Sequence, residues 1–283
     1  MSVAIVQQKL LSYKCQTVEE QENALKEIAQ EIALMALSRS GFFRIAAFQG
    51  GTCLRILYGL ERFSEDLDFV LVTPDANFKW GPYIKTMAEE FQAYGYTLEI
   101  TDKSTVDKIA KNAFIKADSK GGLLIIKDLR TNRAKLQIKL EIDVNPPAGS
   151  IEELKFLDFP LPYSIRTQDL PSLFASKSYA LLCRAYIKGR DWFDFLWYVS
   201  RKVNINFNLL KNAINQAGPW KNNNISVDKA WFLQELKNKI ISMDWEDAKK
   251  DVARFLRPRE LAALEVWSSA FFISRVDILE KYL

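Results

Sequence analysis

Two aspartates one residue apart, Asp66 and Asp68, stand at the start of an apolar segment and are the residues best suited to chemistry. Side chains at i and i+2 of a strand point to the same face, so both carboxylates would project together while Leu67 and Phe69 face the core. Carboxylate oxygens are ligands for hard cations such as Mg²⁺, which also binds nucleotide phosphates. The spacing therefore predicts a metal–nucleotide site at the end of a buried strand.

A glycine turn, Gly50-Gly51-Thr52, lies shortly before these aspartates. Such a turn can bring backbone N–H groups close to a phosphate, and the Thr52 hydroxyl adds a donor. A glycine pair is also common where a strand passes into a helix, so the turn alone has a purely structural explanation. Taken with Asp66 and Asp68, it indicates a triphosphate site and favours a nucleotidyltransferase.

A third acid is offered by the segment 135–144, where apolar and polar residues alternate as in a strand with one polar face. Lys139, Glu141 and Asp143 share that face. A carboxylate from here, placed beside the two aspartates, would complete a two-metal site in which one metal holds the triphosphate and the other activates an acceptor hydroxyl. Spacing does not decide between Glu141 and Asp143, and an ordinary solvent-exposed face has the same pattern.

Further charged residues lie in the helical second half of the chain. The spacing of Lys177 and Arg184 predicts that they share one helical face. Asp191 and Asp194 should face the same way on the next helix. A lysine and an arginine near the triphosphate would neutralise charge on the leaving pyrophosphate, so both are candidate phosphate ligands. Ordinary surface ion pairs with helix acids are the structural alternative.

The amino-acid composition excludes several kinds of catalytic and metal site. The 283 residues include no histidine, which excludes Ser-His-Asp and Cys-His catalysis and every His-ligated metal. Any catalytic metal would be Mg²⁺ or Mn²⁺ on carboxylates. The three cysteines are scattered and predict neither a disulfide framework nor a zinc site. With no long apolar run and no signal-peptide pattern, we expect a cytoplasmic protein without a membrane partner.

The net charge of +4 permits a nucleic-acid partner without requiring one. Lysines and arginines recur between residues 103 and 139, where they would form either a basic patch or an ordinary solvated face. Such a patch, with Arg184 and Arg190, could hold an RNA backbone through its phosphates.

Hydrophobic periodicity predicts an α+β protein. We expect a nucleotidyltransferase-like α/β domain with a mixed sheet at residues 1–165 and an α-helical domain at 166–283 that completes the active site. A proline-containing connector is expected over 145–164. The strands are expected at 42–48, 67–72, 96–101 and 135–144, and the helices at 19–40, 54–58, 80–94, 169–187, 190–201, 206–216, 226–241, 244–255 and 258–281.

Three segments, in this order, resemble the AbiEii/AbiGii family of toxin nucleotidyltransferases, within the DNA polymerase β-like superfamily: FQGGTCLRILYGLERFSEDLDF, KLEIDVNPPAG and LFASKSYALLCRAYIKGRDWFDFLWYV. The resemblance covers roughly residues 42–200. It implies an NTP- and Mg²⁺-dependent transferase that is the toxin of a toxin–antitoxin or phage-defence pair. The usual Gly-Ser of the superfamily is Gly-Thr here, which keeps the hydroxyl.

Carried over by position, the resemblance also implies a set of site residues. These are Gly51 and Thr52 for the nucleotide, Asp66 and Asp68 for the metal, Glu141 or Asp143 as the third acid, Lys177 for phosphate, and Asp194 (less directly Asp191) as a late acidic residue.

The function implied is transfer of a nucleoside monophosphate to an RNA 3′ end, with tRNA the leading acceptor. A cognate antitoxin that needs no stable complex, and a monomeric state, are expected. The alternatives are a transferase that modifies a protein hydroxyl, a non-catalytic NTP-binding regulatory module, and an interaction protein built on the C-terminal helices. Modification of Ser64 would place negative charge beside the metal site, although this serine has an equally simple role in capping the strand entrance.

Overall fold

The computed structural model describes residues 2–102, 119–128 and 136–283, and within them a seven-stranded mixed sheet has the order β3-β4-β5-β2-β1-β7-β6. β1 pairs with β2 antiparallel and with β7 parallel, and β2 pairs with β5 parallel. The expected α+β class with a mixed sheet is confirmed. The strands are β1 (Ala46–Gln49), β2 (Leu67–Leu71), β3 (Tyr96–Asp102), β4 (Ser119–Asp128), β5 (Leu136–Asp143), β6 (Glu152–Leu157) and β7 (Tyr163–Gln168).

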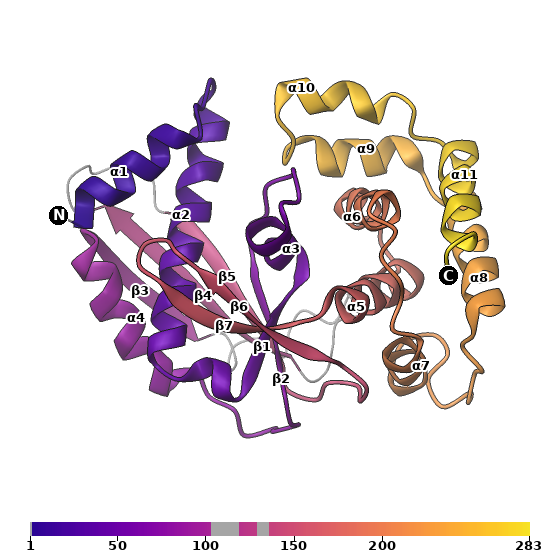
Figure 1. Cartoon of the computed structure of the whole chain (residues 1–283), viewed down its shortest axis with the longest axis horizontal. Coiled ribbons are helices and arrows are strands. Elements are labelled where there is room, and N and C mark those ends of the chain that lie inside the picture. The colour runs from indigo at the N-terminus through magenta and orange to yellow at the C-terminus, as the bar shows by residue number, and fades with distance from the viewer. Residues whose placement is uncertain (1, 103–118, 129–135) are drawn as a thin grey trace.

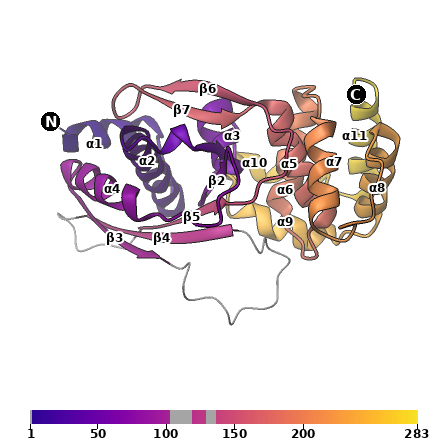
Figure 2. The ribbon, with the colours of Figure 1, turned by 90° about the horizontal axis from the view of Figure 1, so that it is seen from below.

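The sheet curves around two helices. Figure 2 shows α2 (Val18–Arg39) and α4 (Gly81–Ala93) between the β6–β7 end and the β3–β4 end of the sheet. Thr17 begins α2 with a capping box, in which its side chain accepts from the N–H of Glu20 and the Glu20 side chain accepts in return. The short helix α1 (Ser2–Ser12) packs on α2.

The helical half lies beside the sheet (Figure 1). Side chains of Asp169, Asn206, Asp228, Asp244 and Ser268 each cap a helix by accepting from first-turn N–H groups. The helices are α5 (Leu170–Cys183), α6 (Gly189–Ser200), α7 (Phe207–Gln216), α8 (Lys229–Ile241), α9 (Trp245–Ala253), α10 (Pro258–Leu261) and α11 (Ser269–Glu280).

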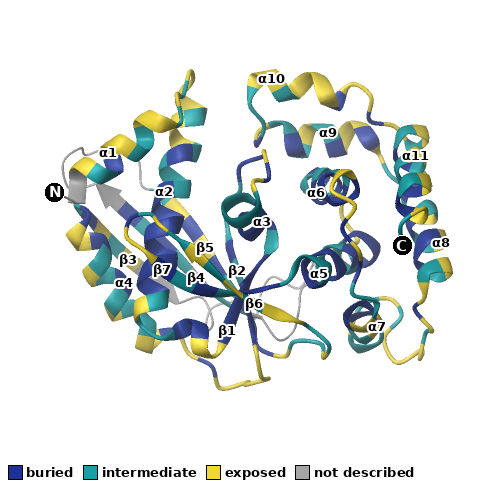
Figure 3. Ribbon diagram, viewed as in Figure 1, coloured by how far each residue is buried: buried dark blue, intermediate teal, exposed yellow. Residues whose placement is uncertain are grey.

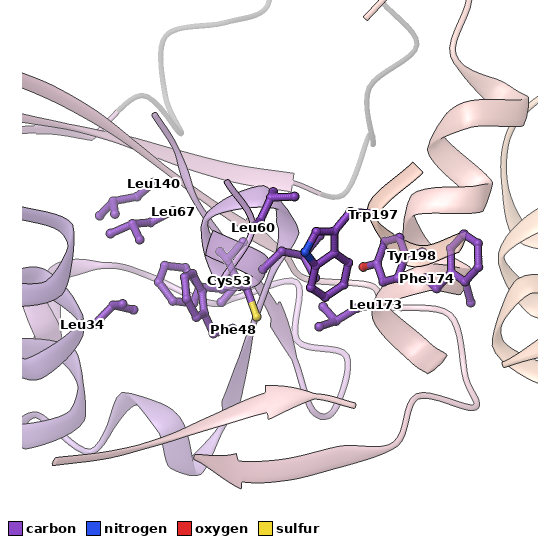
Figure 4. Packing of buried hydrophobic residues seen from close by; sticks show 14 of the residues in the cluster. Leu34, Phe48, Cys53, Leu60, Leu67, Leu140, Leu173, Phe174, Trp197 and Tyr198 are labelled. Carbon is purple, nitrogen blue, oxygen red and sulfur yellow. The ribbon is translucent and has the colours of Figure 1, made fainter. Parts of the chain in front are cut away.

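One apolar core runs through both halves. Figure 3 shows buried residues along β1 and β2 and on into α5 and α6. At closer range, Leu34 and Phe48 lie on the sheet side, while Trp197 and Tyr198 lie on the helical side of the same cluster (Figure 4). Phe174 of α5 stacks on Tyr198 of α6 with ring centroids 4.3 Å apart. The division at residue 165 stays a prediction, and the last strand ends just beyond it at Gln168.

Three expectations about elements were wrong. The segment 145–164 is not a connector, because it contains β6 and the start of β7, which pair as an antiparallel hairpin. The single helix expected over 258–281 is broken, since a 3-10 turn at Ala262–Leu264 follows α10 and Ser268 caps a new helix. Residues Phe42–Arg44 form a 3-10 turn, so β1 begins only at Ala46.

Two further expectations concern a basic patch and membrane-spanning helices. The basic stretch expected between residues 103 and 139 lies largely outside the described residues, so it stays a prediction. In the described part of the chain, no helix combines the length and the apolar character needed to cross a bilayer.

Candidate active site

The glycine turn is the first turn of a helix. β1 ends at Gln49, and α3 (Gly50–Tyr58) starts at the next residue. The first N–H groups of a helix have no partner within it and are suited to bind anions. Gly50 has a φ of +82°, and a Cβ there would overlap the Asp68 carboxylate. Glycine is therefore required, and the turn lies directly against Asp68.

Strand pairing brings a third acid beside that aspartate. In the register of β2 and β5, Asp68 is opposite Glu141, whereas Asp143 is opposite Val70. Paired residues of neighbouring strands point to the same face, so Asp68 and Glu141 lie side by side. Asp143 is buried further along the strand, and its Oδ1 accepts from the N–H of Asn145. Of the two candidates that the sequence left open, the register favours Glu141.

The other aspartate, Asp66, lies just before β2. Its backbone carbonyl accepts a hydrogen bond from the hydroxyl of Thr52, which is fully buried. The threonine thus ties the turn to the aspartate loop. Burial raises the pKa of the Asp66 carboxyl, and the charge of Glu141 raises it further, while Lys188 and Lys139 lower it. The three carboxylates Asp66, Asp68 and Glu141 therefore share one small region.

These carboxylates fit Mg²⁺ by their chemistry. Within residues 2–102, 119–128 and 136–283, no group of three or more acids, cysteines or histidines is close enough to form a metal cage. Mg²⁺ does not need one, because it usually binds through one or two carboxylates together with substrate phosphates and water. A pair of hard-oxygen ligands beside the N–H groups of a helix end suits a metal-bound triphosphate.

The helical residues expected at the site form a buried ion-pair network. Lys177 donates from Nζ to Asp191 at 2.7 Å and contacts Asp194 at 2.8 Å. Arg62 donates from Nε and Nη2 to the two oxygens of Asp194, both at 2.7 Å. Arg184 contacts Asp191 at 3.1 Å. We call these five residues the Arg62–Asp191 network.

Charge pairing in the network outweighs the cost of burial. Burial by itself would raise the pKa of the Asp191 and Asp194 carboxyls. Lys177 nevertheless holds the pKa of Asp191 well below its usual range, and Arg62 and Lys177 lower the pKa of Asp194. Both carboxylates therefore stay ionised, and Lys177 has two full partners before any nucleotide arrives.

Asp191 and Asp194 lie on one face of α6, as the sequence indicates. Arg184 does not share a helical face with Lys177, because α5 ends at Cys183 and Arg184 has an extended conformation. Lys177 and Arg184 nevertheless both form ion pairs with Asp191.

Two residues of this region were missed by sequence reasoning. Arg62 lies against the turn, since a Cβ on Gly51 would overlap its guanidinium. Lys188 lies just before α6, and its positive charge lowers the pKa of the Asp66 carboxyl. Each is a single cation in a connecting segment, where no periodicity indicates which way a side chain points. The one signal in the sequence was position, because Arg62 lies a few residues before Asp66 and Lys188 lies a few residues before Asp191.

A helix N-terminus beside strand carboxylates is the arrangement expected of a nucleotidyltransferase, and comparison with known proteins gives the family. The model of the family described as nucleotidyl transferase AbiEii toxin, type IV TA system, matches residues 32–271, and the chain belongs to this family. The expected family and enzyme class are confirmed. Membership gives a toxin of a type IV toxin–antitoxin system, with an NTP substrate and a cognate antitoxin.

The comparison with solved structures found matches from Helicobacter pylori. The crystal structure of JHP933 has 17% sequence identity and a TM-score of 0.49, covering 92% of this chain and 90% of that one. A candidate nucleotidyltransferase from the same organism has 17% identity and a TM-score of 0.47, covering 89% and 90%. No curated protein matches the chain.

Proposed function

We propose that this protein transfers a nucleoside monophosphate from an NTP to the 3′ end of an RNA, in a reaction that depends on Mg²⁺ or Mn²⁺. The leading acceptor is tRNA. The observation that supports this most is the strand register that sets Glu141 beside Asp68, whose carboxylate lies against Gly50. The acceptor hydroxyl would displace pyrophosphate from the α-phosphate.

Each residue has a role in this proposal. Asp66 and Asp68 would hold the divalent cation together with the substrate phosphates, and Glu141 would be the third acid beside them; when bound, the cation neutralises the phosphates and lowers the pKa of the acceptor hydroxyl. The N–H groups at Gly50 and Gly51 would hold phosphate oxygens, which suits the positive end of the helix dipole.

The contacts favour a positioning role for the Arg62–Asp191 network. Asp194 fixes Arg62, and Arg62 in turn lies against Gly51. Lys177 of α5 makes ion pairs with both Asp191 and Asp194 of α6, and these contacts hold the two helices together. Through Arg62 the helical half would set the place of the phosphate-binding turn.

Proposals about the cellular setting follow from the family alone. The transferase would act as a toxin in the cytoplasm, in toxin–antitoxin regulation or phage defence. The antitoxin would counter it without forming an obligatory complex, and the toxin itself would be a monomer.

Labelled transfer tests the proposed reaction. Purified protein is incubated with total RNA, Mg²⁺ and each α-³²P-labelled NTP in turn. We expect one NTP to label a band of tRNA size, and Asp66→Ala/Asp68→Ala to abolish the label. The matched control is Asp158→Ala, an exposed aspartate on the β6–β7 turn that should leave labelling unchanged.

The other outcomes point to the alternative functions. Label on a polypeptide in place of RNA would make the acceptor a protein hydroxyl. A complete lack of label, with NTP binding retained, would favour the non-catalytic binding module and contradict the proposal.

A further inference from the structure

A polar cleft lies between the N-terminal helices and the short helix α10. Its volume is about 630 Å³, and α1, α2 and the turn that joins them line one side, while residues 257–259 line the other (Figure 1). Cations outnumber carboxylates in its walls: the cations are Lys9, Lys14, Arg257 and Arg259, and the carboxylates are Glu20 and Glu27. We call this region the α2–α10 cleft.

Both carboxylates of the cleft already have positive partners. Glu27 accepts from Nε of Arg55 at 2.7 Å and from the hydroxyl of Tyr13 at 2.8 Å. Glu20 belongs to the capping box of α2 and accepts from the backbone N–H of Gln16 at 2.6 Å. Since Arg55 and the positive end of the helix dipole offset these two charges, the acids do little to repel an anion from the cleft.

Lys14 and Arg257, on opposite sides of the cleft, lack an acidic partner. In the part of the chain that the structure describes, neither makes an ion pair, whereas Lys9 contacts Glu31 at 3.1 Å. The Arg257 guanidinium lies over the ring of Phe63, 5.6 Å from its centroid. This contact uses the face of the guanidinium and not the N–H donors in its plane. Two such cations facing one cleft are suited to a ligand that carries phosphates.

One chain segment joins the cleft to the candidate active site. Phe63, which contacts Arg257, donates its N–H to the carbonyl of Phe255 at 2.9 Å. The preceding residue, Arg62, lies against Gly51 of the phosphate-binding turn. Consecutive residues therefore contact the cleft and the turn, so a polymer held in the cleft lies next to the site.

We propose that the α2–α10 cleft binds the sugar–phosphate backbone of the RNA acceptor, with Lys14 and Arg257 contacting phosphates from opposite sides. This inference deepens the proposed function and rests on it for the identity of the polymer. An NTP has no use for a second basic cleft, whereas an RNA whose 3′ end enters the site has further phosphates along its length. Arg184 and Arg190, which the sequence suggested for the RNA, pair with acids and do not line the cleft.

Binding of 5′-labelled tRNA, with Mg²⁺ and without NTP, tests the inference by fluorescence anisotropy at several salt concentrations. The test variant is Lys14→Asn/Arg257→Gln. Because two phosphate contacts are lost, the slope of log K against log salt should become shallower by about 1.5, and binding at 0.1 M salt should weaken about tenfold or more. The KM for NTP should not change.

The matched control carries the same two substitutions elsewhere, as Arg201→Gln/Lys202→Asn. Lys202 has the same left-handed backbone as Lys14, with φ values of 52° and 51°, and Arg201 lies over an aromatic ring as Arg257 does. Neither control residue lines the cleft. The control should therefore bind tRNA within about twofold of the wild type, because the number of phosphate contacts is unchanged.

Thermal melting separates binding from folding. Asparagine adopts the left-handed conformation more readily than lysine, so Lys14→Asn alone should melt at the wild-type temperature or above it. Weaker tRNA binding by this single variant, at unchanged or higher melting temperature, supports the inference. If binding weakens only in variants that melt at much lower temperature, the effect is one of packing and the inference is overturned.

Further outcomes separate the inference from the proposed function. Affinity of the test variant within about twofold of wild type, with transfer to RNA intact, would overturn the inference and leave the function standing. Binding of tRNA that depends on Lys14 and Arg257, without any transfer, would do the reverse. A wild type that binds no RNA would overturn the inference. So would tighter binding of labelled polyglutamate than of RNA, with the same dependence on both residues, because the cleft would then be a surface for an acidic protein segment.

Discussion

Replacing Arg62 by methionine should be the most destabilising single change in the Arg62–Asp191 network. The Arg62 guanidinium and the Asp194 carboxylate are almost completely buried, at 3% and 0% side-chain exposure. Removing one partner of such a pair leaves an uncompensated buried charge, which costs about 3–5 kcal/mol. Asp194 keeps Lys177 at 2.8 Å, so we expect the lower end, about 3 kcal/mol.

Urea unfolding and thermal melting measure this effect. For a chain of this size, about 3 kcal/mol corresponds to a fall of about 6–12 °C in melting temperature. Arg62→Lys should lie between the wild type and Arg62→Met, because a lysine keeps the charge but loses the paired geometry of the guanidinium. The exposed Arg44→Met is the matched control and should change little.

A double variant tests the physical reason. In Arg62→Met/Asp194→Asn the orphaned charge is removed, so the loss of stability should be smaller than in Arg62→Met alone. The reasoning is refuted if Arg62→Met unfolds at the urea midpoint of the wild type, or if removing the charge of Asp194 makes the variant still less stable.

The remaining predictions concern the turn, the third acid and a buried glutamate. Gly50→Ala should abolish transfer and lower the unfolding free energy by about 1–3 kcal/mol in urea titrations, since its Cβ has no room and the backbone is left-handed. Glu141→Gln should eliminate nucleotide transfer while Asp143→Asn retains it, and the opposite pattern of rates would contradict the register argument. Burial raises the pKa of Glu31 to about 7 despite its ion pair with Lys9. Because the folded state binds this proton more tightly, its stability should fall as pH rises from about 4.5 through 7, and Glu31→Gln should lack that fall in unfolding free energies measured across the range.

Features with a local period could be predicted from the sequence. The alternation in 135–144 and the apolar residues after Asp66 led to the correct strands β5 and β2, because side chains in a strand alternate between its faces. The hairpin of β6 and β7 was missed, because prolines at 160 and 162 favour a loop in any local interpretation. Those prolines lie between the paired segments.

The arrangement of the site depended on contacts between distant segments. Our proposal of Glu141 over Asp143 rests on the pairing of β2 with β5, which no spacing in the sequence contains. The partners of Lys177 could not be predicted either. The sequence places Asp191 and Asp194 on one helical face, but it does not show which residues pack against that face. Arg62 has no periodic neighbours at all, and only the fold shows that it reaches Gly51.

The continuous core has a consequence for dividing the chain. Leu173, Phe174, Trp197 and Tyr198 pack in the same apolar cluster as Phe48 and Cys53, so each half covers apolar surface of the other. Separate polypeptides for residues 1–168 and 169–283 would each expose that surface to water. Expressed alone, neither piece should harm a cell, whereas producing the two together should restore toxicity by reassembly, which would make the toxin a split reporter of association.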